Sequence, residues 1–318
     1  MSRAYGCLPA TPDARDYLAR ATAPYAGAFV DLTAGFPEDP YDQGKLGSCV
    51  SNGTVAAVDF ARVKMGLAPF KRPCRLFVYY QGRVRGGYPV SQDTGLQIRD
   101  GFTVIAKDGA PPETDWAYDI TKFTVKPPAR AYADAALDAA VTYGAVAPGS
   151  IDAMVASGFP VVFGMAVYES FESDAVSQSG VVPVPDRQRE KNVGGHCMVI
   201  VSTLRDGSQI PGGTPGVRYR RVRNSWGTSW GLSGYCWIPE NVFLIDASDF
   251  WQVSTMSDPG KPVPPTPPAP PGFPAGLVAA VTAAATDPGV ATFLKAPHSG
   301  STKVAADRLL AILAAPRK

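Results

Sequence analysis

The sequence predicts an α+β fold with two lobes, because helical patterns come first along the chain and strand patterns follow. Residues 49–65 and 95–107 carry the helical signals. From about residue 158, β-branched and aromatic runs alternate with Gly and Pro, which is typical of strands. Helices and strands that are segregated along the chain indicate a helical lobe packed beside a strand-rich lobe.

The two predicted helices have recognisable ends. Ser48 stands just before the first helix, and Gly66 follows its last residue. Serine favours helix starts through its side-chain oxygen, and glycine favours helix ends because it adopts a left-handed conformation without strain. The second helix is expected to begin at Gly95 and to end near Gly109.

The predicted strands follow these helices in the chain. Each is a short β-branched or aromatic run bounded by Gly or Pro. The four runs are 160–168, 196–204, 217–222 and 234–239. We expect them to form the strand-rich lobe.

A proline-rich stretch divides the chain near its C-terminal end. Proline fixes φ and cannot donate a backbone hydrogen bond, so this stretch is predicted to be an extended linker. Helical patterns at 275–285 and 303–314 follow it. A segment of this size rarely builds its own core, so we expect an appendage or a helical tail that docks on a protein partner. The predicted organisation is a leader (1–30), a main domain (31–256), a linker (257–272) and a small helical tail (273–318).

Charge and hydropathy argue against several classes of partner. The 318 residues carry 30 Lys and Arg against 28 Asp and Glu, so the net charge is +2. That excess is too small to predict binding to nucleic acid or to an anionic membrane. No apolar stretch is long enough to cross a bilayer. The N-terminus lacks the apolar core of a secretory signal, so we expect cytoplasmic synthesis, with export by a route without such a signal left open.

The cysteine count points away from metal binding. The five cysteines are an odd number, and their spacings match neither a zinc site nor a disulfide framework. We therefore expect mostly reduced, buried thiols in a reducing compartment, and no metal. The pairing state of Cys7, Cys74 and Cys236 stays open.

Cys49 is the candidate nucleophile. It ends a Gly-rich loop and begins the first predicted helix. The positive end of a helix and its unpaired N–H groups stabilise a thiolate, which is the reactive form of cysteine. His196 is the one histidine before the linker, so a cysteine–histidine mechanism has one base in the main domain. The alternatives are a small buried cysteine and a structural histidine.

Two amide side chains complete a candidate catalytic set. Gln43 lies six residues before Cys49, where its amide could donate to an oxyanion beside the Cys49 N–H. Asn224 lies among tryptophans and glycines, and its oxygen could fix the tautomer of His196. The alternatives are a surface-loop glutamine and a tight turn with aromatic core anchors.

These residues give the chain a resemblance to papain-like cysteine peptidases. Residues 43–50 read Gln-Gly-Lys-Leu-Gly-Ser-Cys-Val, where the family has Gln-Gly-x-Cys-Gly-Ser-Cys-Trp. Residues 224–235 contain the whole motif Asn-Ser-Trp-Gly-x-x-Trp-Gly-x-x-Gly-Tyr, and His196 follows two glycines as the family's histidine does. The resemblance implies a helical left lobe and a β-barrel-like right lobe.

The resemblance also implies roles for single residues. Cys49 would be the nucleophile, His196 the base and acid, Asn224 the residue that orients the imidazole, and Gln43 an oxyanion donor. Family members bind substrate backbone through a Gly-Gly segment, for which we expect Gly95 rather than residues 86–87. Three further residues are expected to line the main specificity pocket, with core packing as the alternative for each: Gly164, Met165 and Cys197.

Three positions depart from the family pattern. Leu46 stands where many members have a disulfide-forming cysteine, and Val50 replaces the usual tryptophan. Gly195 replaces the frequent acidic or asparagine residue before the histidine. The long inhibitory pro-domain is replaced by a short leader, which suggests a bacterial or viral subgroup.

The predicted function is that of a cysteine endopeptidase without a cofactor, acting on peptide or protein substrates through an acyl-enzyme. A catalytically silent binding module and acyl transfer to an amine are the alternatives. Residues 1–30 are too few for a domain, so we expect the leader to lie across the cleft, with Tyr5 or Tyr17 near it, as in a zymogen.

Overall fold

The computed structural model describes residues 3–256, apart from 12, 14–15, 20, 22–24, 68–70 and 137–140, and without the side chains of 254–256. The chain divides into two compact units. The first comprises Met1–Thr11 and Asp16–Pro262, and the fold below is that of this unit. The predicted linker (257–272) and helical tail (273–318) lie outside the described residues.

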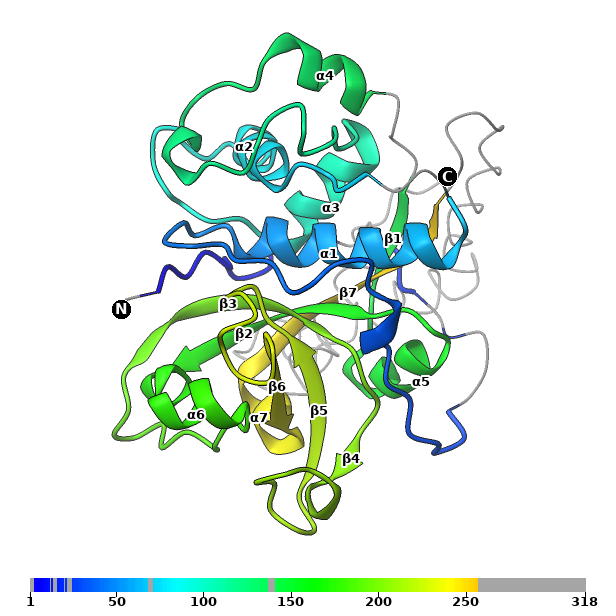
Figure 1. Cartoon of the computed structure of the whole chain (residues 1–318), viewed down its shortest axis with the longest axis vertical. Helices are drawn as coiled ribbons and strands as arrows, with labels where there is room; N and C mark the ends of the chain where they lie inside the picture. Colours follow the sequence, from blue (N-terminus) through cyan, green and yellow to red (C-terminus); the bar gives the residue numbers. More distant parts are fainter. Residues whose placement is uncertain are drawn as a thin grey trace, which may run out of the picture. The chain divides into compact units, whose positions relative to one another are not determined.

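The described residues form a sheet with a group of helices packed on one side of it, and shorter helices lie around the rest of the sheet (Figure 1). Helix α1 confirms the prediction for 49–65, and α3 begins three residues later than predicted. Helix α2 had no expected counterpart. The α-helices are α1 (Cys49–Lys64), α2 (Arg75–Arg85), α3 (Ile98–Lys107), α4 (Ala129–Ala135), α5 (Ile151–Ala156), α6 (Asp174–Ser179) and α7 (Glu240–Asp246).

Seven strands form one antiparallel sheet with the order β1-β7-β2-β3-β5-β4, and β6 pairs with the free side of β5. The sheet is open rather than barrel-like. Strands β2, β5 and β6 confirm the predicted runs, whereas β3 begins and ends four residues earlier than expected. The strands are β1 (Val141–Ala145), β2 (Val161–Tyr168), β3 (Asn192–Ile200), β4 (Arg205–Asp206), β5 (Arg218–Arg223), β6 (Tyr235–Pro239) and β7 (Ala247–Met256).

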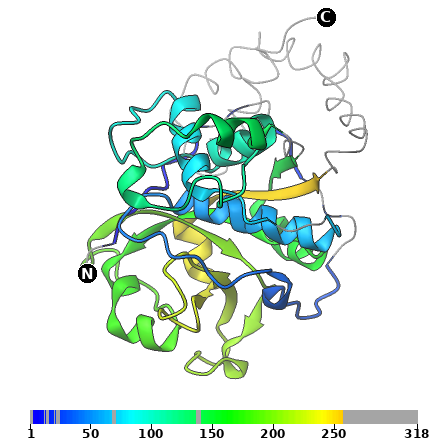
Figure 2. The same ribbon diagram turned by 45° about the horizontal axis from the view of Figure 1, so that its top comes forward.

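Helix α1 lies between the helices α2, α3 and α4 on one side and the sheet on the other (Figures 1 and 2). Every residue from 49 to 61 is buried, so the helix has no solvent-exposed face over its first three turns. Val50 faces α3 where Gly101 has no side chain; a Cβ at Gly101 would lie 3.1 Å from Val50 Cγ1. This close approach explains why a small residue replaces the family's tryptophan. Leu46 is buried in the same core and occupies the place of the absent cysteine.

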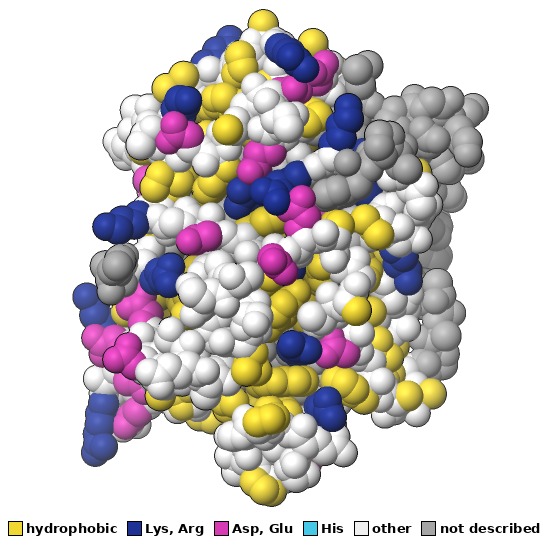
Figure 3. All heavy atoms as spheres, viewed as in Figure 1, with side chains coloured by type: hydrophobic (Ala, Val, Ile, Leu, Met, Phe, Trp, Pro, Cys, Tyr) yellow, Lys and Arg dark blue, Asp and Glu magenta, His cyan; other side chains and the backbone are white. Residues whose placement is uncertain are grey.

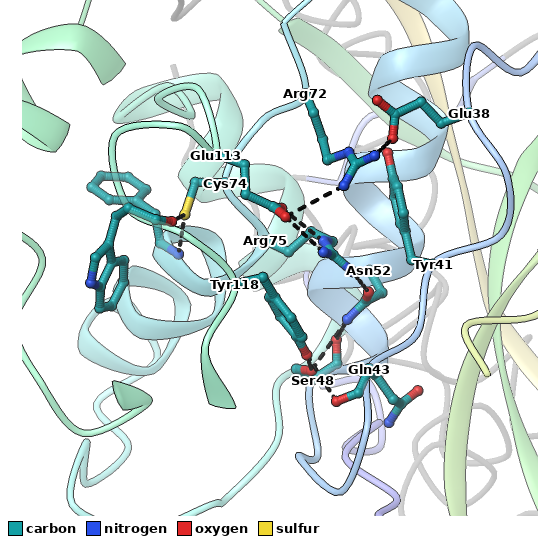
Figure 4. Close-up of polar contacts among 12 residues, drawn as sticks. Glu38, Tyr41, Gln43, Ser48, Asn52, Arg72, Cys74, Arg75, Glu113 and Tyr118 are labelled. Atoms are coloured by element: carbon teal, nitrogen blue, oxygen red, sulfur yellow. Dashed lines mark hydrogen bonds and ion pairs between the residues drawn. The ribbon is translucent and has the colours of Figure 1, made fainter. Parts of the chain in front are cut away.

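A buried polar network holds the loop before α1 (Figure 4). Ser48 occupies the N-cap position, but its hydroxyl does not cap the helix; it lies 2.6 Å from the Tyr118 hydroxyl. Asn52, one turn into α1, donates to the Ser48 carbonyl (3.0 Å). Arg75 in turn donates to Asn52 Oδ1 (3.0 Å) and makes two bonds to Glu113, of 2.8 and 2.9 Å.

The surface carries charges of both signs. On the face seen in Figure 3, basic and acidic side chains are interspersed rather than gathered into fields of one sign. Within the described part of the chain, no helix has the length and apolar character needed to cross a membrane.

We predict that Arg75→Met lowers the free energy of unfolding by about 3 kcal/mol, because it leaves the half-buried Glu113 carboxylate, whose side chain is 14% exposed, without its main partner. The Arg72 guanidinium stays 3.6 Å from Glu113 and limits the loss. Arg85→Met is the matched control, since Arg85 pairs with Asp108 at a more exposed site, where an ion pair contributes about 0–1 kcal/mol. Denaturant titration of both variants measures the difference; equal losses would contradict the assigned role of the network.

Candidate active site

Cys49 is the first residue of α1, and its side chain is fully buried. Backbone groups of Cys197, Gly6 and Val50 act on its sulfur and lower the pKa of the thiol against the effect of burial. Cys197 directly follows His196 in β3, so the thiol lies near the strand that carries the histidine. Gly6 belongs to the leader, which therefore reaches the sulfur of the candidate nucleophile.

His196 is paired with Asn224 as predicted. Its Nε2 lies 2.8 Å from Asn224 Oδ1, which also accepts from the Ser225 N–H at 2.8 Å. An amide oxygen only accepts, so Nε2 carries the proton and Nδ1 has its lone pair available. Nδ1 is buried and has no hydrogen-bond partner among the described residues. The Trp226 ring stacks on the imidazole with centroids 5.1 Å apart and shields the pair from water.

Gln43 is held in place by its own amide oxygen. That oxygen accepts from the Ser225 hydroxyl at 2.6 Å, which joins Gln43 to the residue after Asn224. The amide nitrogen then points away from Ser225 and donates to two carbonyl oxygens, those of Leu46 and Ala4, each at 3.0 Å. The carbonyl oxygen of Ala4, in the leader, thus accepts the hydrogen bond that Gln43 was predicted to donate to an oxyanion.

The leader crosses this site as an extended strand, which we call the leader segment (residues 3–8). It pairs with the helical side through Gly6, whose carbonyl accepts from Leu96 N (2.8 Å), and Leu8, whose N–H donates to Leu96 O (2.8 Å). On the sheet side, Cys7 N donates to Gly195 O (3.0 Å). All three bonds involve backbone atoms, so the cleft holds an extended chain largely irrespective of its side chains.

Glycines make room for the leader segment because they carry no side chain. A Cβ at Gly95 would lie 2.3 Å from Gly6 O, and a Cβ at Gly195 would lie 2.2 Å from Cys7 O. Gly6 itself would place a Cβ 1.7 Å from Gly47 O. Gly195 is therefore glycine here because the leader backbone passes directly over it, which accounts for the third departure from the family motif.

Two leader side chains cover the imidazole and the indole. The Tyr5 ring packs edge-on to His196 with centroids 5.7 Å apart, and its hydroxyl donates to Glu172 at 2.6 Å. The Arg3 guanidinium lies 4.8 Å from the centroid of the Trp226 ring. Tyr5 thus lies at the site as one of the two tyrosines proposed, whereas Tyr17 is exposed and pairs through its backbone with β1 at Ala145.

Burial keeps both candidate catalytic groups uncharged. Desolvation raises the pKa of Cys49 to about 12, and the neighbouring Cys7 contributes in the same direction. Desolvation lowers the pKa of His196 to about 4 against the effect of Asn224, and Arg3 lowers it further. The helix start alone predicted a stabilised thiolate. In the leader-covered structure that prediction is wrong, because loss of water outweighs the helix dipole and the backbone donors.

The predicted substrate-binding residues separate into two groups. Gly95 lies directly against the leader segment, and Gly164 lies on the same face of β2 as the Cys7 sulfur, which is 3.0 Å from its would-be Cβ. Cys197 pairs with Gly164 across the sheet and shares this face. Met165 instead belongs to the hydrophobic core of the strand-rich side, so the alternative of core packing holds for it. The rejected candidate segment 86–87 follows α2.

Sequence reasoning missed the residues that position this set. Tyr118 donates to the Gln43 carbonyl at 3.0 Å and contacts Ser48, so it fixes both ends of the loop that carries Gln43. Figure 4 shows Asn52 and Arg75 continuing this support behind the loop. The four-residue spacing from Ser48 to Asn52 could have indicated a contact within the helix. The pairing of Arg75 with Glu113 has no local signal.

Nothing in the described residues resembles a metal centre, since no group of three or more His, Cys, Asp or Glu side chains could hold a metal ion there. All five cysteines are free thiols. The functional groups of this site are a thiol, an imidazole and two amides, and they surround the backbone of an extended peptide.

Comparison with known proteins places this arrangement in a family. A family model described as "Papain family cysteine protease" matches residues 93–248, a span that contains His196 and Asn224 and begins after Cys49. An uncharacterised peptidase C1-like protein of Acanthamoeba polyphaga mimivirus is 34% identical over 289 residues, which cover 81% of this chain and 89% of that protein.

Solved structures agree with this assignment. Xylellain, a cysteine protease from Xylella fastidiosa, is 32% identical with a TM-score of 0.69, over 81% of this chain and 99% of its own. Procathepsin L 3 from the midgut of Tenebrio molitor larvae shares the fold at 18% identity, with a TM-score of 0.58 over 80% of this chain and 76% of its own. The chain therefore belongs to the papain family and is a cysteine peptidase, a hydrolase.

Proposed function

We propose that this protein is an endopeptidase that cleaves peptide bonds through an acyl-enzyme on Cys49, and that its own leader inhibits it. The observation that carries the proposal is the course of the leader segment: its Ala4 carbonyl accepts from Gln43 at 3.0 Å, and its Gly6 backbone acts on the buried Cys49 thiol. A substrate carbonyl in the place of the Ala4 carbonyl would have Gln43 as a hydrogen-bond donor, as acyl transfer requires.

Each side chain then has one role. His196 Nδ1 takes the thiol proton, and the Cys49 thiolate attacks the substrate carbonyl carbon. The Gln43 amide and the Cys49 N–H stabilise the oxyanion. His196 returns its proton to the leaving amine and then activates water, which releases the acyl group. Asn224 accepts a hydrogen bond from Nε2 throughout the reaction, which keeps Nδ1 available for proton transfer.

The leader segment is proposed to inhibit in two ways. It fills the backbone-binding positions at Leu96 and Gly195 that an extended substrate would use. It also excludes water, so that at neutral pH the thiol stays protonated and the imidazole stays neutral. When the leader leaves, water returns, and the pKa of Cys49 falls while that of His196 rises, which favours the thiolate–imidazolium pair.

We predict that Gly6→Val activates the full-length enzyme, because a side chain at this position collides with the Gly47 carbonyl and lifts the leader segment. We expect kcat/KM for a fluorogenic peptide to rise by about tenfold or more, which corresponds to at least about 1.4 kcal/mol of lost leader binding. Ala10→Val, at an exposed leader position, is the matched control and should leave turnover as it is. Unchanged activity in Gly6→Val would remove the inhibitory role from the leader.

In the Gly6→Val background, Asn224→Ala should lower kcat by about 10- to 100-fold, since a hydrogen bond to a group that becomes charged contributes about 1.5–3 kcal/mol. The exposed Asn241→Ala is the control.

In the same Gly6→Val background, an epoxysuccinyl thiol inhibitor should label Cys49 and should fail to label it when His196→Ala is added; peptide mass mapping locates the label. Equal labelling of the five thiols would contradict the assignment of Cys49 as nucleophile.

A further inference from the structure

Three of the five thiols converge on the cleft. Cys49 and Cys197 come from the main domain, and Cys7 comes from the leader. The other two lie elsewhere: Cys74 donates to the Trp116 carbonyl at 2.9 Å, and Cys236 is buried in β6. Peptide hydrolysis uses the thiol of Cys49 alone, so the proposed mechanism assigns no role to the thiols of Cys7 and Cys197.

The sheet brings Cys7 and Cys197 together. Gly164 and Cys197 stand directly opposite each other in the β2–β3 pair, so their Cα–Cβ bonds point to the same face. The Cβ atoms of such a pair lie about 4.5–5.5 Å apart. The Cys7 sulfur lies 3.0 Å from the position that a Gly164 Cβ would take, because glycine leaves that place open. The leader thiol therefore fills the gap directly beside the Cys197 side chain.

A second observation comes from the thiol of Cys197. Burial raises its pKa well above the ordinary value, and the neighbouring Cys7 side chain is the next cause in the same direction. For Cys49, backbone groups of Gly6, Cys197 and Val50 lower the pKa of the thiol, whereas Cys7 raises it through charge. Cys7 thus affects Cys197 through its side chain, in agreement with its position beside Gly164.

We propose that Cys7 and Cys197 are an oxidisable thiol pair whose disulfide ties the leader segment to β3 inside the cleft. The inference rests on the proposed function in one respect, namely that the tied leader is the inhibitor. Reduction would leave the leader held by its backbone hydrogen bonds, and oxidation would add a covalent bond. The enzyme would then be released from its leader only under reducing conditions.

The chemistry needs an oxidant, for which oxidised glutathione serves. The half-buried Cys7 thiolate attacks one glutathione sulfur, forms a mixed disulfide and releases the first reduced glutathione. The Cys197 thiolate then attacks the Cys7 sulfur, which forms the protein disulfide and releases the second reduced glutathione. Two thiol protons and two electrons leave the protein, and the oxidant takes them up. Because burial disfavours the Cys197 thiolate, the second step should accelerate as the pH rises.

Tryptic mapping of the full chain tests the pairing directly. Cleavage after Lys and Arg puts Cys7 in peptide 4–15, Cys49 in peptide 46–62 and Cys197 in peptide 192–205. After incubation with oxidised glutathione, alkylation of free thiols and digestion without reductant, we expect 4–15 joined to 192–205 as the main cross-linked species. It should be missing from Cys7→Ser. A product that joins 4–15 to 46–62, or glutathione on Cys7 without any cross-link, would overturn the proposal.

A second readout separates this proposal from the proposed function. In Cys49→Ala, which has no nucleophile, the cross-link should still form. It closes a loop from residue 7 to residue 197, and the midpoint of thermal unfolding should rise by several degrees on oxidation. Cys7→Ser in the same background should show no such shift. An unchanged midpoint in Cys49→Ala would count against the disulfide, whereas a cross-linked enzyme that is as active as the reduced one would count against inhibition by the leader.

Discussion

Exclusion of water from the pair Cys49 and His196 is the constraint on which the rest of this structure depends. A thiolate and an imidazolium are both costly in a dry site, so the covered pair is uncharged, with a pKa of about 12 for the thiol and about 4 for the imidazole. The backbone donors around the sulfur and the start of α1 favour the thiolate, but their effect is smaller. We propose that the pair becomes reactive when the leader segment gives way to water and substrate.

The geometry is kept by contacts that have no part in the reaction. Helix α1 is buried on all sides over its first turns, so Cys49 begins a helix that is enclosed by the rest of the domain. Tyr118 and Arg75 hold the loop that carries Gln43, and Ser225 ties the same glutamine to the segment of Asn224. Cys49 comes from the helical side and His196 from the sheet, so this network fixes two parts of the chain that are far apart in sequence.

Local patterns were sufficient for much of this arrangement. The start of α1, three of the four predicted strands, and the pairing of His196 with Asn224 all follow from short motifs, because caps, alternation and catalytic signatures are encoded within a few residues. The sequence did not indicate α2, β1 or β7, nor the pairing of Arg75 with Glu113, because these depend on tertiary packing. The start of β3 was placed too late because Gly194 and Gly195 weaken a strand pattern, whereas in the fold these glycines make room for the leader.

The most direct test of this account is the rate of alkylation of Cys49 as a function of pH, followed by mass spectrometry of peptide 46–62 in the reduced full-length protein and in Gly6→Val. Alkylation reports the thiolate, so its rise with pH follows the pKa of the thiol. We expect the rise in the reduced full-length protein to lie at much higher pH than in Gly6→Val, where water reaches the site. Coincident profiles would show that the leader does not control the charge of Cys49 and would contradict the account.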